Sequence, residues 1–576
     1  MSTWLIRTGV LLMLLIARPL AAQDGGSDAG LVSDAAAASD ASVSDAASAA
    51  APQLISGWPV EFAAGTAGGY LFSPRQGAAI ADLDGDKQLE VIRAAGDALW
   101  VWDANAKPRA GFPVKIGAVG QAAPTVGDLD GDGKLEIVQV TRGARFSDPS
   151  EVIAVDHTGK PLPSWPVHLF NLVFQPASVV DLDGDGKDEV LVQSAIWPDK
   201  GTLFAYNHLG KPFSRHWPQN VQGLPVSPLA VGDLDDDGRI EIGLLTGERV
   251  YLFDAEGQLK PGFPINAADK RKFRGGIVAA QLDPARQQRA LLWLSAADLT
   301  EGGEIALHAV WSDGKPVSGF PASTTLASTP QAPPVVGDVD GDGKLEIVIT
   351  AQVPGRVLIL DTAGKILQTI STTASVSAEP TLVDVDGDGD LELLVDNNTL
   401  EQDAGFLEGY HHDGKPLAGF PIRTRGTTLS NSATVDDIDG DGILELAIGT
   451  IALGEAKAWL ELWKLPKAQR HPMDWPTTSG NVRRSGCIDC ATAPKTPWKA
   501  DGGTPDAAPA DAGVAADAAS TNRDASADAG GQSGGGGCSL ASASLATGGL
   551  WWLLLGLAVL PLLRRRRSPA DAGSSL

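Results

Sequence analysis

Four acidic residues in one short stretch of the sequence could bind a divalent cation. Asp128, Asp130, Asp132 and Glu136 stand at positions 1, 3, 5 and 9 of a loop that also holds two glycines. Glycine lets the chain turn sharply enough for alternate carboxylates to converge on one centre. Carboxylates so close repel one another without a cation, and hard oxygen ligands in a flexible loop favour Ca²⁺ over Mg²⁺. The stretch therefore predicts a calcium-binding loop.

The same acid spacing recurs six more times along the chain. The other candidate ligands are Asp82, Asp84, Asp86 and Glu90; Asp181, Asp183, Asp185 and Glu189; Asp233, Asp235, Asp237 and Glu241; Asp338, Asp340, Asp342 and Glu346; Asp384, Asp386, Asp388 and Glu392; and Asp437, Asp439, Asp441 and Glu445. Two copies replace a glycine of the turn, with Lys87 and with Asp236. Asp-Gly clusters also make plain hairpin turns, but repetition of one acid spacing favours metal binding.

We expect about six or seven structural Ca²⁺ ions, each holding in place a loop that would otherwise fray. The charge of the chain supports this interpretation. Asp and Glu number 71 against 45 Lys and Arg, for a formal net charge of -26. Such an excess of acid argues against nucleic-acid binding, which needs a basic face.

The loops belong to a repeat whose copies start 46 to 57 residues apart. A worn copy that keeps only Asp283 fills the gap between the fourth and fifth acidic loops. An aromatic-Pro pair keeps the same period from Trp58-Pro59 to Trp475-Pro476, with one copy missing near Ile370. Repeat units of this length predict an all-β fold, a β-propeller of four-stranded blades. Eight units favour eight blades, and seven blades with one degenerate flanking unit is the alternative.

In the second unit, four β-rich runs flank the acidic loop and the turn that follows it. They are 124–129, 135–141, 151–156 and 165–170. Helical periodicity is absent from the repeats. Each unit is therefore expected to supply one blade.

The motif Gly-Asp-Leu-Asp-Gly-Asp-Gly, with a Glu four residues after its last Asp, resembles the FG-GAP/VCBS repeat family. That family includes the integrin α-subunit propellers and several secreted microbial proteins. The resemblance implies that each loop joins two strands of a blade and that a backbone carbonyl at position 7 adds a ligand. The fold hosts adhesins, lectins and lyases alike, so it does not by itself define a function.

The repeats, within 55–492, lie between segments of different composition. Residues 1–22 read as a signal peptide. Residues 23–54 and 493–537 are Ala- and Asp-rich and should be disordered linkers. Cys538 then begins a segment, 538–567, of Cys-Ser, an apolar run and four arginines, before a short tail at 568–576.

This C-terminal segment resembles the sorting signal of myxobacterial surface proteins, in which the helix is removed and the protein is delivered to the cell exterior at the Cys. The alternative is a plain membrane anchor, with its arginines on the cytoplasmic side. In both cases the bulk of the chain is exported, to the cell surface, the outer membrane or the medium. Contact with a membrane is expected only through this segment, before processing.

The remaining cysteines, Cys487 and Cys490, stand in CxxC spacing at the end of the repeats. An exported protein lies in an oxidising compartment, which favours a local disulfide that clamps the closure of the ring. Redox activity and metal binding are the alternatives, although no thioredoxin-like βαβ pattern surrounds the pair.

A catalytic site should break the repeat, and no recognised nucleophile or metalloprotease motif does so. We therefore expect a surface adhesion or ligand-binding protein, with a protein or glycan partner, rather than an enzyme. A secreted polysaccharide lyase on the same scaffold is the alternative, and a purely architectural envelope protein is a third reading.

Overall fold

The computed structural model describes residues 51–495, except 64, 68–69, 73–76, 118, 121, 143–147, 197, 226, 268–271, 297–303, 329, 398–404, 429–430, 453–456, 472–474 and 489. All the regular secondary structure in this part of the chain consists of β-strands. No helix within it is long and apolar enough to cross a membrane. The predicted signal peptide, nearly all of the linkers and the segment at Cys538 lie outside the described residues.

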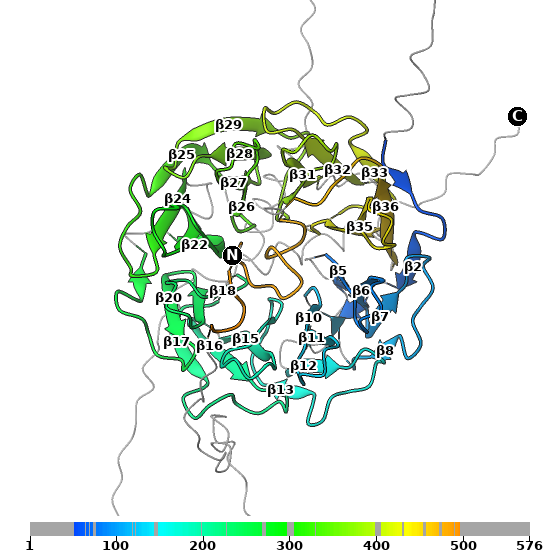
Figure 1. Cartoon of the computed structure of the whole chain (residues 1–576), viewed down its shortest axis with the longest axis horizontal. Helices are drawn as coiled ribbons and strands as arrows, with labels where there is room; N and C mark the ends of the chain where they lie inside the picture. The colour runs from blue at the N-terminus through cyan, green and yellow to red at the C-terminus, as the bar shows by residue number, and fades with distance from the viewer. Residues whose placement is uncertain are drawn as a thin grey trace, which may run out of the picture. The chain divides into compact units, whose positions relative to one another are not determined.

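The described strands form a ring of eight antiparallel sheets, which we number as blades 1 to 8 in chain order (Figure 1). In each blade the strands follow one another from the centre of the ring to its rim. The strands of blades 1 to 4 are β5–β8 (Ala79–Ala81, Glu90–Ala95, Ala98–Trp102, Val114–Lys115); β10–β13 (Thr125–Gly127, Glu136–Arg142, Ser150–Val155, Val167–Leu169); β14–β17 (Ser178–Val180, Glu189–Ile196, Lys200–Tyr206, Gln219–Gln222); and β18–β21 (Ala230–Gly232, Glu241–Leu245, Arg249–Asp254, Ile265–Asn266).

Blades 5 to 7 repeat this order, and blade 8 closes the ring. Their strands are β22–β25 (Lys272–Ala280, Ala290–Ala296, Glu304–Trp311, Ala322–Ala327); β26–β29 (Val335–Gly337, Glu346–Ala351, Arg356–Leu360, Ile366–Ser371); β30–β33 (Thr381–Val383, Glu392–Asn397, Gly405–Tyr410, Ile422–Thr424); and β34–β36 (Thr434–Asp436, Leu444–Ile451, Lys457–Leu465). Strand β9 (Val119–Gly120) adds to blade 2, and β3 (Gly65–Ala67) pairs with β4 (Tyr70–Phe72).

Blade 8 is completed by the N-terminal part of the propeller. Strand β2 (Val60–Ala63) runs antiparallel to β36, with Val60 opposite Leu460, and β1 (Gln53–Leu54) pairs with the end of the same strand. The first and last strands of the propeller therefore share one sheet, which joins the two ends of the ring. This pairing begins at Gln53, two residues before the boundary expected from composition.

The blades pack face to face through their middle strands. All seven residues of β11, from Glu136 to Arg142, are buried, because each inner strand has a neighbouring blade on both sides. Ile92 and Leu99 of blade 1 thus share one apolar cluster with Val126 and Ile137 of blade 2.

The tryptophans of three aromatic-Pro pairs, Trp58, Trp165 and Trp217, each link two blades. Trp165 of blade 2 donates a hydrogen bond from Nε1 to the carbonyl of His208 in blade 3, at 3.0 Å. Trp58, before the outer strand of blade 8, bonds in the same way to Ala104 of blade 1. These tryptophans are therefore part of the contact between one blade and the turn of the next.

The chain after β36 turns into the centre of the ring, where its orange trace crosses the inner strands (Figure 1). We call residues 475–495 the central segment. Its carbonyls accept hydrogen bonds from inner-strand amides of six blades, at 2.6 to 3.2 Å. The donors are Val126, Val179, Val231, Ala279, Leu382 and Val435. The segment thereby pairs the inner edges of the blades, which would otherwise present unsatisfied backbone groups.

The predicted all-β, eight-bladed propeller is confirmed, and the seven-bladed alternative is wrong. The four strands expected in the second unit are present, with ends within two residues of the predicted ones. One landmark has a different role. Trp475 does not precede an outer strand but is fully buried in the central segment, bonded to Leu382.

Candidate metal centres

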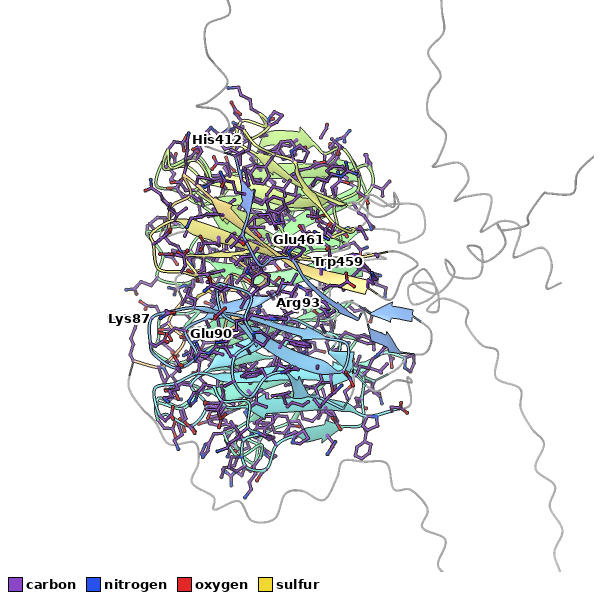
Figure 2. The ribbon with its side chains drawn as sticks, turned by 90° about the vertical axis from the view of Figure 1, so that its right-hand side faces the viewer. Lys87, Glu90, Arg93, His412, Trp459 and Glu461 are labelled. Carbon is purple, nitrogen blue, oxygen red and sulfur yellow. A yellow bond between two sulfur atoms is a disulfide. The ribbon has the colours of Figure 1, made fainter. Side chains whose placement is uncertain are left out.

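Each acidic loop connects the innermost strand of its blade to the second strand, so that all seven loops occupy equivalent places. Figure 2 shows Lys87 and Glu90 of the first loop, and His412 beside the loop of blade 7, toward the same side of the ring. Trp459 lies toward the other side. The repeat therefore gathers its carboxylates on one face of the propeller.

One hydrogen bond sets the turn in every loop. Asp128 at position 1 accepts, on Oδ2, the amide of Gly133 at position 6, at 3.0 Å. The equivalent bond forms in the other six loops at 2.9 to 3.2 Å, from Lys87, Gly186, Gly238, Gly343, Gly389 and Gly442. The aspartate at position 1 is thus oriented by the backbone of its own loop.

The two copies that lack a glycine keep this turn. Lys87 adopts a φ of 70° where Gly133 has 86°, and Asp236 adopts 58° where Gly131 has 77°. Left-handed backbone is costly for residues with a side chain. These two loops therefore keep the turn and its hydrogen bond although the residue is not a glycine.

The glutamate at position 9 is the first residue of the second strand, or its second residue in blade 8, and it is buried in every loop. Oε2 of Glu136 accepts the amide of Leu129, at position 2, at 2.8 Å. The same bond forms in the other six loops at 2.7 to 3.0 Å. Since Oε2 is held by the backbone, Oε1 is the oxygen left to face the aspartates.

Burial and the neighbouring aspartates disfavour the charged form of this glutamate. Burial, followed by the charges of the loop aspartates, raises the pKa of Glu136 and of Glu346 to about 7, and raises that of Glu189 well above its usual value. A divalent cation beside these carboxylates would favour their charged form instead.

The carboxylates of a loop converge closely enough to share one ion. Ligand atoms of Asp128, Asp130 and Asp132 lie within 4.8 Å of one another. The same holds for the groups Asp82, Asp84 and Asp86; Asp181, Asp183 and Glu189; and Asp233, Asp235 and Glu241. An all-oxygen set of this kind suits Ca²⁺.

A buried oxygen in blade 6 tests whether these residues fit a cation. Asp338 is 4% exposed, and its Oδ1 has no hydrogen-bond partner, although Oδ2 accepts the amide of Gly343. The equivalent Oδ1 atoms of Asp233 and Asp437 are also buried without a partner. A buried oxygen without a partner is unfavourable, and a bound cation would supply one. The donor set therefore fits calcium.

Among the described residues, four basic side chains that the repeat motif does not include contact a position-9 glutamate. Arg109 contacts Asp84 and Glu90 in blade 1. The other three are Lys260 in blade 4, Lys464 in blade 8 and His411, whose Nδ1 lies 3.0 Å from Oε1 of Glu392 in blade 7. The sequence held a signal for two of them. Arg109 and Lys260 stand three residues before an aromatic-Pro pair, where Leu162, Val317 and Leu417 are apolar.

Blade 5 contains the worn copy of the loop. Ala290 is the first residue of its second strand and pairs with Ala280, as Glu241 pairs with Gly232 in blade 4. Of the expected ligands only Asp283 remains, and its Oδ1 accepts the amide of Ala285. Here the strands are joined by an ordinary turn without a cluster of acids.

Two buried ionisable groups of opposite sign, Arg484 of the central segment and Glu379 of blade 7, join the segment to the blades. Arg484 is fully buried and donates to the carbonyls of Ala78 and Pro124 at 3.1 and 3.2 Å, and to that of Thr478 at 2.7 Å. Glu379 accepts from Nε1 of Trp475 at 2.6 Å, and its burial raises its pKa to about 7. These groups link the segment to blades 1, 2 and 7 without a metal.

Cys487 and Cys490, in the same segment, form a disulfide, with Cα atoms 5.7 Å apart. Cys487 lies beside β22, as a bridge to Ala279. The disulfide therefore lies next to the inner strand of blade 5 rather than at the β2–β36 pairing that closes the ring.

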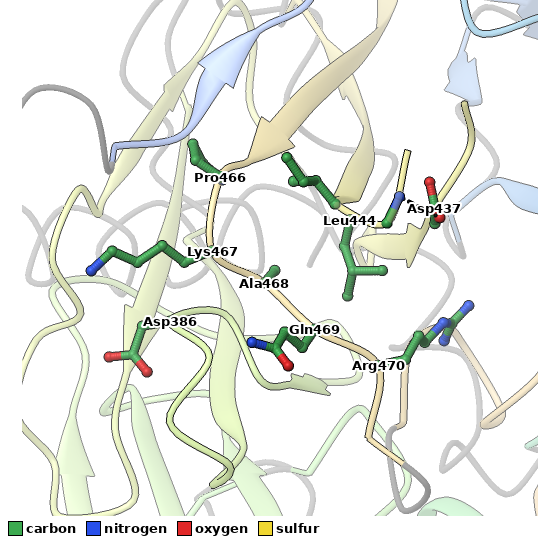
Figure 3. Close-up of a pocket in the computed structure, with 10 residues that line it drawn as sticks. Asp386, Asp437, Leu444, Pro466, Lys467, Ala468, Gln469 and Arg470 are labelled. Carbon is green, nitrogen blue, oxygen red and sulfur yellow. Dashed lines mark hydrogen bonds between the residues drawn. The ribbon is translucent and has the colours of Figure 1, made fainter. Parts of the chain in front are cut away.

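A hollow of about 600 Å³ lies between the loops of blades 7 and 8 (Figure 3). Asp386 and Asp437 contribute to it from the loops, and Lys467, Gln469 and Arg470 come from the chain that leads to the central segment. It therefore combines acids and bases beside two candidate metal centres.

Comparison with known families agrees with the repeat. The FG-GAP-like repeat family matches residues 74–138 and 338–395, which include the acidic loops of blades 1, 2, 6 and 7. The protein is thus an eight-bladed β-propeller that carries FG-GAP-like repeats.

Several solved structures resemble the chain at low identity. The biofilm matrix protein Bap1 of V. cholerae is 12% identical, with a TM-score of 0.48 over 77% of this chain and 97% of that one. The Dos1 propeller is 11% identical, with a TM-score of 0.42 over 72% and 96%. A quinohemoprotein alcohol dehydrogenase from Comamonas testosteroni is 12% identical, with a TM-score of 0.41 over 75% and 79%. No curated protein sequence matches the chain. Proteins this distant need not share a function with it.

Proposed function

We propose that this protein is an exported calcium-binding propeller that presents a ligand-binding or adhesive surface outside the cell. The observation that carries the calcium assignment is the repeated loop, in which the position-1 aspartate and the position-9 glutamate are each held by a backbone amide. The buried Oδ1 of Asp338, which has no hydrogen-bond partner, supports it. Calcium would neutralise carboxylates that otherwise repel one another across a few ångströms.

A measurement of bound metal tests the calcium assignment. The purified full chain is dialysed against metal-free buffer with EGTA, then titrated with CaCl₂ by calorimetry, with MgCl₂ titrated in parallel. We expect several Ca²⁺ ions per chain and much weaker binding of Mg²⁺, which demands stricter geometry. If the titration with CaCl₂ gives no heat of binding and elemental analysis finds no bound calcium, the loops are turns that do not bind metal.

The proposed surface role is supported by the fold and by the export expected from the sequence. A rigid ring that displays many loops is a suitable support for a binding surface, since function in such scaffolds is carried by loops. We expect the chain to be displayed outside the cell, with Cys538 needed for processing. Surface labelling of intact cells that produce the wild type or Cys538→Ser tests this. Equal amounts of the two proteins at the cell surface would show that Cys538 is not needed for display.

The ligand itself can be sought directly. Glycan arrays and binding to intact cells, each with calcium and with EGTA, would compare the loaded and unloaded propeller. We expect binding that requires calcium, because the acidic loops lie on one face of the ring. A protein that binds neither cells nor glycans in either condition would instead support the architectural role.

The alternative function, a polysaccharide lyase, is not favoured by any specific feature of the described residues. Such an activity would need a cluster of Arg, Lys, His or Tyr side chains with a calcium ion at the central channel. The central segment instead crosses the centre of the ring and bonds to inner strands of six blades. The binding role is therefore the one we propose.

A further inference from the structure

We propose that the seven acidic loops are of two kinds, and that those of blades 1, 4 and 8 are neutralised by the chain's own Arg109, Lys260 and Lys464 instead of by calcium. This inference rests on the proposed calcium binding of the remaining loops, in blades 2, 3, 6 and 7. It divides a repeat that looks uniform in sequence into metal-binding and self-compensated copies.

Lys260 shows the arrangement most fully. Its Nζ lies 2.7 Å from Oδ2 of Asp235, 3.7 Å from Oδ2 of Asp237 and 3.1 Å from Oε1 of Glu241. One ammonium group thus contacts the acids at positions 3, 5 and 9. Its side chain is only 17% exposed, so the contact lies inside the loop rather than on the open surface.

In blades 1 and 8 a cationic side chain also contacts the acids of the loop, but it comes from a different part of the blade in each case. In blade 1 the guanidinium of Arg109 contacts Asp84 and Glu90, at positions 3 and 9. In blade 8 the ammonium of Lys464 lies 3.4 Å from Asp439 and 3.5 Å from Glu445, and also contacts Asp441. Lys464 lies on β36 directly opposite Glu445, whereas Arg109 follows the third strand of its blade.

Arg109 and Lys260 occupy one structural position of the blade. The amide of Arg109 bonds to the carbonyl of Val101, and that of Lys260 to Leu252, in each case a residue of the third strand. The same bond is made by Leu162, Phe213, Val317 and Leu417 in blades 2, 3, 5 and 7. The position is therefore apolar in four blades and basic in two, and both basic copies lie in blades that keep their acidic loop.

Blade 6 provides the contrast. Lys344 at position 7 contacts Asp342 at 2.6 Å, but its side chain is 73% exposed. An exposed pair of this kind is weak and readily opened. The acids of this loop, including the unpartnered Oδ1 of Asp338, thus lack a buried internal cation of the kind that Lys260 provides.

An internal cation competes with calcium for the same oxygens. Calcium in the loop of blade 4 would have to displace the ammonium of Lys260 or lie within a few ångströms of it, where two positive charges repel strongly. At position 1, Oδ1 of Asp233 and of Asp437 has no partner, whereas Oδ2 accepts a backbone amide of the loop, so the inference depends on positions 3, 5 and 9. We expect calcium affinity at these loops to be at least about tenfold weaker than in blades 2, 3 and 6.

Counting ions in matched variants tests the inference. Calcium bound per full chain is measured by elemental analysis after equilibration at one fixed free calcium concentration. The wild type is compared with Arg109→Leu and Lys260→Leu, each of which places leucine where blade 2 has Leu162. Lys415→Met is the control, because Lys415 is 78% exposed and pairs only with Asp413 outside the loops.

The expected result is four ions or fewer in the wild type, with one more in each leucine variant and no change in the control. Five or more ions in the wild type, or no gain in the leucine variants, would overturn the inference while leaving calcium binding intact. No calcium in the wild type would contradict the proposed function itself. Circular dichroism and thermal unfolding of each variant establish that it is folded, and Lys260→Met, which keeps more of the side-chain length, repeats the test if a leucine variant is not.

Discussion

Buried charged groups have hydrogen-bond partners at the centre of the ring, whereas the acidic loops leave some of theirs without one. In the centre, Arg484 is fully buried but bonds to three backbone carbonyls, and Glu379 accepts two hydrogen bonds, from Trp475 and Ser479. In the loops, three or four carboxylates lie together, and the Oδ1 of Asp338 has no partner. The centre is complete without an ion, whereas the loops of blades 2, 3 and 6 present a surplus of negative charge.

Blade 5 shows that the propeller does not need these acids in order to form. Its second strand begins with Ala290, and β22 and β23 still pair along their length. The amide of Arg289 bonds to the carbonyl of Leu234 in blade 4, as Leu135 of blade 2 bonds to Leu83 of blade 1. Strand pairing and packing therefore build the ring, and the acids of the other blades serve a separate purpose.

The largest effect on stability is expected at the centre, from Arg484→Met. Loss of the guanidinium removes its hydrogen bonds to the carbonyls of Ala78, Pro124 and Thr478 and leaves Glu379 without its opposite charge. We expect a loss of about 3–5 kcal/mol in the free energy of unfolding, measured by urea denaturation, with the same loss in calcium and in EGTA. Arg470→Met, at an arginine that is 42% exposed, is the control and should change it by less than about 0.5 kcal/mol. A loss that depends on calcium would mean that the centre and the loops are coupled.

A pH dependence of the centre is the next largest effect. Burial raises the pKa of Glu379 from 4.5 to about 7. Between these values the folded chain holds a proton that the unfolded chain has released, so stability falls as pH rises from about 4.5 to 7 and then levels off. The difference between wild type and Glu379→Gln, measured in EGTA, isolates this effect. The variant should gain roughly 3 kcal/mol relative to wild type between pH 4 and pH 8. Parallel pH curves for the two proteins would show that folding leaves the pKa of Glu379 unchanged.

A smaller, calcium-dependent effect is expected in blade 6. Asp338→Asn removes one carboxylate charge with little change in shape and should abolish one bound ion. At a calcium concentration well above Kd we expect a loss of about 2 kcal/mol in stability, and a much smaller loss in EGTA. The matched variant Asp283→Asn, in the worn loop of blade 5, should change stability by less than about 0.5 kcal/mol in both conditions. Equal effects of the two variants would contradict the distinction between intact and worn loops.

The sequence predicted the ring and the loops for a physical reason. Strand, acidic loop and turn are local features, so each repeat displays them within about 50 residues. Contacts between distant parts could not be read in the same way. Trp475 keeps the aromatic-Pro spacing, yet its backbone pairs with Leu382 on the inner strand of blade 7. Likewise, Lys464 reaches its loop only because β36 folds back beside β35, which places it opposite Glu445.

Thermal unfolding of the full chain, in EGTA and in millimolar calcium with the bound ions counted in parallel, tests the central claim most directly. We predict a large upward shift of Tm with calcium and a small set of tightly bound ions, because each ion stabilises a folded loop and not the unfolded chain. An unchanged Tm with no bound calcium would contradict the account, and the acidic loops would then be turns alone.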